Sequence, residues 1–150
     1  MFEERYFPSS RLKDWLTAHD IETEIIGSSE LGKPIHAIRL GEGPVKILMW
    51  SQMHGNESTT TRGLLIWLEK NLQSSHYHKE LSLLIIPQLN PDGADKYTRA
   101  NGKGIDLNRD ALNQSQSEMK VLMRLVEEFR PHYNLNLHDQ RTRFTVGDTN

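Results

Sequence analysis

The apolar residues of the chain fall into segments with two different spacings. Segments 45–52 ("VKILMWSQ") and 81–90 ("LSLLIIPQLN") are nearly continuous apolar runs, which is typical of strands buried on both faces of a sheet. Segment 132–140 ("HYNLNLHDQ") alternates more and is predicted to form a third strand. Two shorter β-branched segments, 21–29 and 33–41, are separated by a glycine-containing loop, so we expect neighbouring antiparallel strands there.

Helices are predicted between these strands. Apolar residues recur every three or four positions in 58–73 and in 117–131, and Pro131 stops the second of these segments. A short helix is expected over 8–20, with one of the two serines at its start as the capping residue. Segment 91–115 is rich in glycine, asparagine and aspartate and is predicted to be a long loop.

The order of these elements predicts an α/β fold. Strand, helix, strand, loop, helix and strand in succession is the pattern of parallel strands joined by right-handed crossovers. We therefore expect a three-layer α/β/α architecture with a mixed, largely parallel sheet. The 150 residues suit a single domain, and a chain of this length buries about 70% of the surface that it exposes when unfolded.

Composition excludes several classes of function. The chain has no cysteine, so a transition-metal site must use histidine, aspartate or glutamate. Its formal net charge is -2 with acids and bases interspersed, which argues against a nucleic-acid partner. No apolar run approaches the roughly 18 residues of a membrane span. The N-terminal "MFEERYFPSS" lacks the apolar core of a signal peptide, so we expect a cytoplasmic protein without a membrane partner.

Candidate metal ligands follow two of the predicted strands. In parallel sheets, ligands bind beyond the carboxyl ends of the strands. His54 and Glu57 follow the first buried strand, and His138 ends a different one. Two histidines and a glutamate form a known catalytic zinc site in which a fourth position stays open. The spacing of His54 and Glu57 alone also fits a structural explanation, because the helix dipole favours glutamate in a first turn.

The long loop carries a second set of candidate residues. Connections of this length within a compact domain are usually functional or disordered. Arg99, Asn108 and Arg109 lie between the turn residues of the loop. Arginine forks grip carboxylates and stabilise developing oxyanions. The alternative explanation is that these side chains are solvated surface charges.

Three motifs in chain order resemble the zinc carboxypeptidase (carboxypeptidase A-like) family. They are "HGNE" (54–57), "NPDGADKYTRANGKGIDLNRD" (90–110) and "NLHDQ" (136–140), and the resemblance spans about residues 45 to 139. The resemblance implies a metallocarboxypeptidase with one Zn²⁺ per chain, which hydrolyses a C-terminal amide bond next to a free carboxylate. The implied partner is a peptide or acyl-amino-acid substrate that carries this carboxylate.

The resemblance also implies which residues hold the metal. His54, Glu57 and His138 match the three zinc ligands of the family. Asp106 matches an acid outside the ligand set that accepts a hydrogen bond from the first histidine. Such a bond orients the imidazole ring and raises its basicity.

Three further residues match positions that contact the substrate in the family. Arg99 matches the arginine that polarises the scissile carbonyl group and stabilises the tetrahedral oxyanion. Asn108 and Arg109 match the pair that grips the free C-terminal carboxylate. These roles imply that only the terminal amide bond of a peptide reaches the metal.

One position departs from the digestive members of the family. Asn56 stands where those enzymes carry an arginine. Asparagine or aspartate is usual there in the deacylase branch and in some bacterial murein-peptide hydrolases. The alternative interpretation is therefore a deacylase or amidase of the same superfamily that acts on acyl-amino acids or murein peptides.

The catalytic base is the second departure. In the family, a catalytic glutamate and a substrate-contacting tyrosine lie well beyond the third zinc ligand, and no residue here matches either role. Glu118, Glu127 and Glu128 precede His138 in the chain, and none of them is assigned as the catalytic base. We therefore expect 1–150 to be the N-terminal part of a single catalytic domain, incomplete at its C-terminus and inactive by itself. A non-catalytic zinc- or peptide-binding module is the alternative if residue 150 is the natural end.

Overall fold

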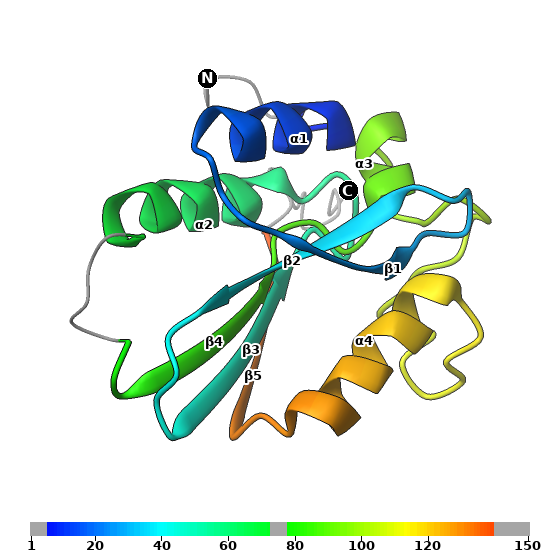
Figure 1. The fold of residues 1–150 in the computed structure, drawn as a ribbon. Coiled ribbons are helices and arrows are strands. Elements are labelled where there is room, and N and C mark those ends of the chain that lie inside the picture. Colours follow the sequence, from blue (N-terminus) through cyan, green and yellow to red (C-terminus); the bar gives the residue numbers. More distant parts are fainter. Residues whose placement is uncertain (1–5, 73–77, 140–150) are drawn as a thin grey trace, which may run out of the picture.

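The computed structural model describes residues 6–72 and 78–139 (Figure 1). Its centre is a five-stranded sheet in the order β1-β2-β4-β3-β5. No helix among the described residues is long and apolar enough to cross a membrane. The strands are β1 (Glu24–Ser28), β2 (Pro34–Leu40), β3 (Val45–Ser51), β4 (Leu81–Ile86) and β5 (Tyr133–Leu137).

The directions of the strands confirm the mixed, largely parallel sheet. β3 pairs in parallel with β4 on one side and with β5 on the other. β2 is antiparallel to both of its neighbours, β1 and β4, so it alone among these strands runs in the opposite direction. The antiparallel pairing of β1 with β2 agrees with the prediction for the two β-branched segments.

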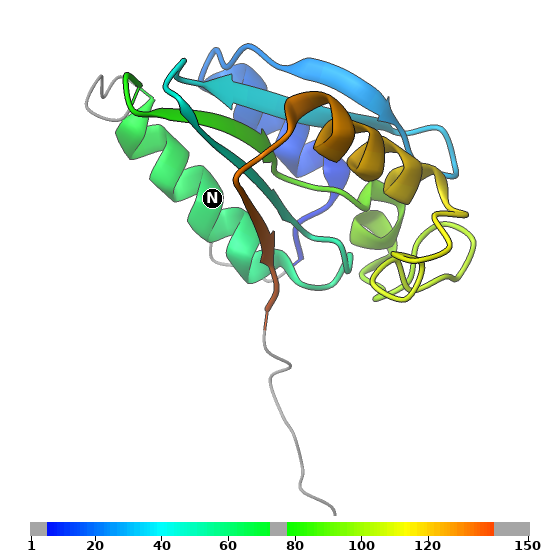
Figure 2. The same cartoon turned by 90° about the horizontal axis from the view of Figure 1, so that it is seen from below.

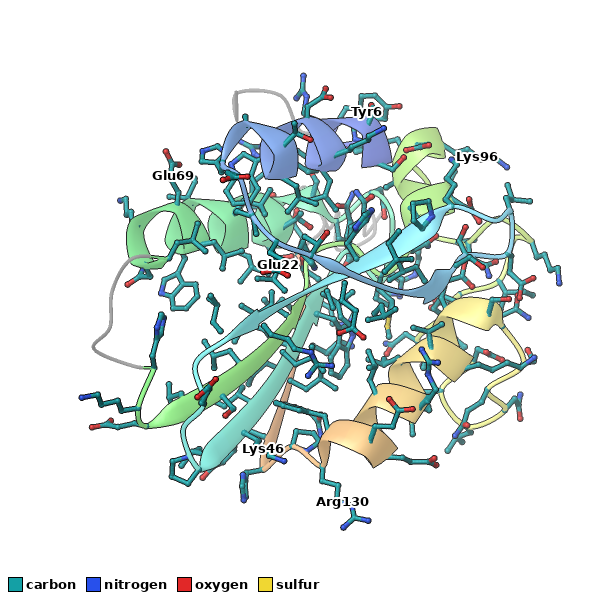
Figure 3. All side chains as sticks on the ribbon, viewed as in Figure 1. Tyr6, Glu22, Lys46, Glu69, Lys96 and Arg130 are labelled. Carbon is teal, nitrogen blue, oxygen red and sulfur yellow. The ribbon has the colours of Figure 1, made fainter. Side chains whose placement is uncertain are left out.

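The helices form a layer on each side of the sheet. α1 (Ser9–Ala18) and α2 (Ser58–Asn71) cover one face, and α4 (Ser117–Phe129) covers the other (Figures 1 and 2). This arrangement confirms the three-layer α/β/α architecture. Side chains fill the space between the sheet and both helical layers (Figure 3).

Alternate residues of the central strands enter different cores. Leu48 of β3 and Leu84 of β4 pack with Leu122 and other residues of α4. Ile85 of β4 instead belongs to the core under α1 and α2, which also contains Leu65. Because both faces of β3 and β4 are covered, both sets of alternating positions must be apolar, which explains the nearly continuous apolar runs.

The predicted loop contains a helix that the sequence pattern did not indicate. α3 (Pro91–Lys96) is six residues long and begins directly after Asn90, whose side-chain oxygen accepts a hydrogen bond from the Gly93 amide at 2.8 Å. It ends at Tyr97, which has a left-handed backbone with φ 52°. A helix of this length has no apolar periodicity, so only its capping residues signal it.

The start of α1 also differs from the expectation. Neither serine is the capping residue, because Pro8 takes that position and no side chain of the cap bonds the helix. Ser9 is already helical, and its backbone amide and hydroxyl group donate to the Asp95 carboxylate at 2.7 and 3.0 Å. The Asp95 carboxylate of α3 therefore binds the first backbone amide of α1, which is a tertiary contact.

Side-chain hydrogen bonds hold the irregular segment between α3 and α4. Asp110 is buried and accepts from the Ser115 amide, the Ser115 hydroxyl group and the Gln116 amide at 3.1, 2.6 and 2.9 Å. Burial acts to raise the pKa of Asp110, but these hydrogen bonds outweigh it and hold the pKa below its ordinary value. Asn101 joins the two ends of the segment by donating to the side chains of Gln116 and Glu118.

We predict that Asp110→Ala lowers the free energy of unfolding by about 1–2 kcal/mol at pH 7, because it leaves these donors without their acceptor. The lowered folded-state pKa makes this stabilisation complete above the ordinary aspartate pKa of about 3.9, and it is lost as pH falls through the folded value. Urea unfolding should therefore show a difference between parent and variant that shrinks below about pH 4. Removing the exposed Asp14 carboxylate is the matched control, and an equal loss in Asp14→Ala would contradict the prediction.

Candidate metal centre

Two neighbouring strands bring the candidate ligands together. β3 and β5 are parallel, and Ser51 lies opposite Leu137 at their carboxyl ends. The chain that follows β3 carries His54, and His138 directly follows β5. The two imidazole rings lie 4.9 Å apart between centroids with planes inclined by 33°. Figure 2 shows the end of β5 beside the start of α2.

Glu57 lies between the two rings. It occupies the cap position of α2, and its Oε1 and Oε2 lie 2.8 Å from His54 Nδ1 and His138 Nδ1 respectively. One ligand atom from each of these residues lies within 4.8 Å of the others. His54 is buried whereas His138 is exposed, so among the described residues the group is open on one side. This geometry suits a metal ion that must also be reached by a substrate.

Both ring nitrogens of His54 face carboxylate oxygens. His54 Nε2 lies 3.0 Å from Asp106 Oδ1, and a neutral ring that donates its proton there has none on Nδ1. Nδ1 then faces the carboxylate oxygen of Glu57 as a second acceptor. Two acceptors 2.8 Å apart need a proton or a metal cation between them. With a donor set of two imidazoles and one carboxylate, these residues fit a divalent ion such as zinc.

Arg99 and Asp106 complete a closed ring of contacts with His54 and Glu57. Arg99 donates from Nε to Asp106 Oδ2 at 2.9 Å and from Nη1 to Glu57 Oε1 at 3.2 Å. Burial acts to raise the pKa of Asp106, but hydrogen bonds from His54 and Arg99 outweigh it and lower the pKa. Asp106 therefore stays ionised at neutral pH, which keeps it an acceptor for the histidine.

Asp106 also shapes the turn that carries Asn108 and Arg109. Its carboxylate accepts a hydrogen bond from the backbone amide of Asn108 at 3.0 Å, and its carbonyl oxygen accepts one from the backbone amide of Arg109 at 3.0 Å. Both side chains are exposed. Within the described residues, the Arg109 guanidinium makes no ion pair with an acid. Among the described residues, the turn thus presents the Asn108 side-chain amide and the Arg109 guanidinium group to solvent.

Several backbone contacts of the site were not predicted from the sequence. The Asp139 amide donates to Glu57 Oε2 at 3.3 Å, and the Thr60 hydroxyl group donates to the carbonyl oxygen of Leu137 at 3.1 Å. The Asn56 amide donates to the carbonyl oxygen of Thr98 at 3.1 Å. These contacts tie the cap of α2 to β5 and to the loop. Backbone partners carry no side-chain signature, so no pattern in the sequence indicates them.

Close packing of two glycines joins the "HGNE" and "NPDG" motifs. A Cβ atom at Gly55 would lie 1.9 Å from the carbonyl carbon of Gly93 and 2.2 Å from the amide nitrogen of Ala94. The Asn90 side chain adds a hydrogen bond to the carbonyl oxygen of Met53 at 3.1 Å. Only glycine allows this approach of α3 to the turn before Glu57. In the sequence, the only sign of the contact between Gly55 and Gly93 was that the two motifs occur in the same chain.

A sequence profile of the zinc carboxypeptidase family matches residues 16–136. The chain belongs to the zinc carboxypeptidase family. This result confirms the family resemblance inferred from the three motifs. The match ends two residues before His138, so the third candidate ligand depends on its motif and on the geometry of the site. The roles of the individual site residues stay predictions.

This zinc carboxypeptidase-family chain is similar to two proteins that are named as carboxypeptidases. It is 25% identical over 154 residues to the probable carboxypeptidase 2 of Trichophyton verrucosum, which covers 93% of the chain and 28% of that protein. A metallo-carboxypeptidase structure from Pseudomonas aeruginosa superposes with a TM-score of 0.75 at 24% identity, over 89% of this chain and 40% of that one.

A further structural neighbour is named as an amidase and not as a carboxypeptidase. The murein-tripeptide amidase MpaA of Escherichia coli O157 has a TM-score of 0.61 at 21% identity, over 78% of this chain and 61% of that one. The chain thus spans about a quarter of the fungal protein and less than two thirds of either bacterial structure. At these identities the structural likeness demonstrates the fold.

We predict that zinc raises the unfolding temperature of the chain, because an ion that binds only the folded state stabilises it. The gain is about 2.7 kcal/mol at a free metal concentration of 100 times Kd. His54→Ala combined with His138→Ala should abolish the shift in a thermal melt. The control His36→Ala removes an imidazole on β2 and should keep it. A full shift in the double variant would show that the metal binds elsewhere.

Proposed function

We propose that the chain carries the zinc site and the substrate-carboxylate site of a metallocarboxypeptidase, which hydrolyses a C-terminal amide bond next to a free carboxylate. The observation that carries the proposal is the grouping of His54, Glu57 and His138, whose candidate ligand atoms lie within 4.8 Å of one another. One Zn²⁺ per chain follows from this single three-ligand group among the described residues.

The chain's own residues would hold and orient the metal. His54, Glu57 and His138 supply the ligands, and Asp106 keeps the proton of His54 on Nε2 so that Nδ1 faces the ion. When bound, zinc supplies a Lewis acid that polarises the scissile carbonyl group and makes a water molecule more acidic. The backbone amide of Asp139 holds the second oxygen of Glu57 and limits rotation of its carboxylate.

Arg99 is suited to the carbonyl group that is attacked. Two of its guanidinium nitrogens are anchored, Nε by Asp106 and Nη1 by Glu57. The remaining nitrogen can donate to a substrate oxygen without any reorganisation of the side chain, which is 34% exposed. A preorganised donor of this kind stabilises charge that develops on the oxygen.

Asn108 and Arg109 are suited to the end of the substrate. Their side chains project into solvent from the turn held by Asp106. A guanidinium fork binds a carboxylate through two parallel hydrogen bonds. The Pseudomonas aeruginosa metallo-carboxypeptidase is in complex with (2-guanidinoethylmercapto)succinic acid, a dicarboxylic acid, which supports carboxylate recognition in this family.

A deacylase or amidase of the same superfamily is the second candidate function. It is favoured by Asn56, which replaces the arginine of the digestive enzymes, and by the structural likeness to the murein-tripeptide amidase. The Asn56 side-chain oxygen is buried without a hydrogen-bond partner in the described structure. Peptides, acyl-amino acids and murein peptides should therefore be compared as ligands.

We predict that the zinc-loaded chain binds an N-acyl dipeptide with a free C-terminal carboxylate more tightly than its C-terminal amide. Arg109→Met should reduce this preference by about 10-fold or more, because a hydrogen bond to a charged group contributes about 1.5–3 kcal/mol. Titration calorimetry with both ligands measures the preference. Arg130→Met, which removes an exposed arginine at the end of α4, is the control. Equal affinity of the parent for acid and amide would refute the role of Arg109.

Hydrolysis by the 150-residue chain tests the position of the base. We predict no enzymatic turnover by the zinc-loaded chain, because Glu57 and Asp106 are both engaged at the centre and Glu118 is buried against Glu30. Without a general base the rate falls by about 10²–10⁴-fold. Product analysis by mass spectrometry with peptide acids and acyl-amino acids gives the measurement. Metal-dependent turnover that His54→Ala abolishes would show that these residues already include a base.

A further inference from the structure

The candidate metal centre contains a protein cation in direct contact with one of its ligands. Arg99 donates to Oε1 of Glu57, the oxygen that also faces Nδ1 of His54. The same guanidinium donates to Asp106, which bonds the other nitrogen of His54. Arg99 therefore neutralises both carboxylates on which the ligand His54 depends. A divalent ion would have to share these carboxylates with it.

We propose that Arg99 sets the metal affinity of the centre by stabilising the metal-free arrangement relative to the metal-bound one. This inference rests on the proposed function, because it assumes that the ion is bound by His54, Glu57 and His138. It assigns Arg99 a positioning role in addition to its predicted contact with the substrate carbonyl group.

Two electrostatic effects of Arg99 act in the same direction. Its positive charge repels a divalent cation held by the Glu57 carboxylate, and at such short range this repulsion is large. Its hydrogen bond to Asp106 also draws negative charge away from the Asp106 carboxylate, which bonds and polarises the His54 ring. A less basic partner leaves the imidazole a weaker ligand. Both effects lower the affinity of the centre for the ion.

Removal of Arg99 could also weaken metal binding, because Glu57 and Asp106 would lose a hydrogen-bond partner that orders them. Other contacts in the structure limit this effect. Without Arg99, Glu57 would still be held at Oε2 by His138 and by the Asp139 amide, at 2.8 and 3.3 Å. Asp106 would still bond His54 and the Asn108 amide, each at 3.0 Å. The carboxylates thus keep other donors, so charge rather than order should decide the sign of the change.

A comparison of four variants separates charge from order. Arg99→Met removes the charge and nearly preserves side-chain volume, whereas Arg99→Lys keeps the charge. Asp106→Asn removes the negative charge that supports His54. Arg130→Met is the matched control, because it removes an exposed arginine at the end of α4. Zinc affinity is measured by competition with a chelating dye, and the stability of the metal-free forms by thermal melting.

Opposite signs are expected for the two partners. Arg99→Met should bind zinc about 10-fold more tightly, and Asp106→Asn about 10–100-fold more weakly, on the scale known for groups that bond metal ligands. Arg99→Lys and Arg130→Met should stay within about 3-fold of the parent, a small part of that range. Metal-free Arg99→Met should melt at a lower temperature than the metal-free parent, because two carboxylates lose their counter-charge.

A purely structural role for Arg99 predicts a different outcome. Weaker or unchanged zinc binding by Arg99→Met, alongside normal binding by the parent, would overturn the inference and leave the proposed function standing. Failure of the parent to bind zinc, or binding that survives in the His54→Ala, His138→Ala double variant, would overturn both. If Arg99→Met does not fold, Arg99→Gln carries the same test, because glutamine keeps a donor for Asp106 without the charge.

Discussion

The parallel pairing of β3 with β5 is the constraint on which the candidate metal centre depends. His54 follows one strand and His138 follows the other, and they are far apart in the chain. Because Ser51 lies opposite Leu137, the segments that leave the two strands emerge side by side. The Thr60 hydroxyl group then ties α2 to the last residue of β5. A shift of this register would separate the rings while leaving every motif intact.

Asp106 is the second point at which the site is assembled. One residue accepts hydrogen bonds from a candidate ligand, from Arg99 and from the two backbone amides that begin the Asn108–Arg109 turn. The metal and the substrate carboxylate would therefore be positioned relative to each other through a single side chain and its carbonyl group. Its burial opposes ionisation, and its hydrogen bonds outweigh that effect, which keeps the junction charged.

Packing of α3 against the "HGNE" turn explains why a short helix belongs to the site. The backbone of Gly55 approaches Gly93 so closely that a methyl group at Gly55 would overlap the peptide group of its neighbour. Asp95 on the same helix binds the first turn of α1. α3 thus connects the metal centre to the outer helical layer, although it contributes no candidate ligand. Positions that look like ordinary turn residues in the sequence are here conditions for close backbone contact.

The sequence by itself predicted the strands and the three longer helices, and it indicated the chemistry of the site. Runs such as 81–90 read as buried strands because hydrophobic burial acts on each strand whatever its partners are. The histidines, acids and arginines of the three motifs indicate a metal and a carboxylate because the motifs resemble those of the zinc carboxypeptidase family. Such information is local, so a pattern of residues carries it.

Only the tertiary structure decided which groups meet. The order β2-β4-β3-β5, the bond from Asp95 to α1 and the second contact of Arg99 with Glu57 all join residues distant in the chain. Their geometry depends on how whole layers pack, and no spacing within the sequence encodes an individual distance. The short α3 escaped prediction because six residues are too few to show an apolar period, and its stability comes from the contacts around it.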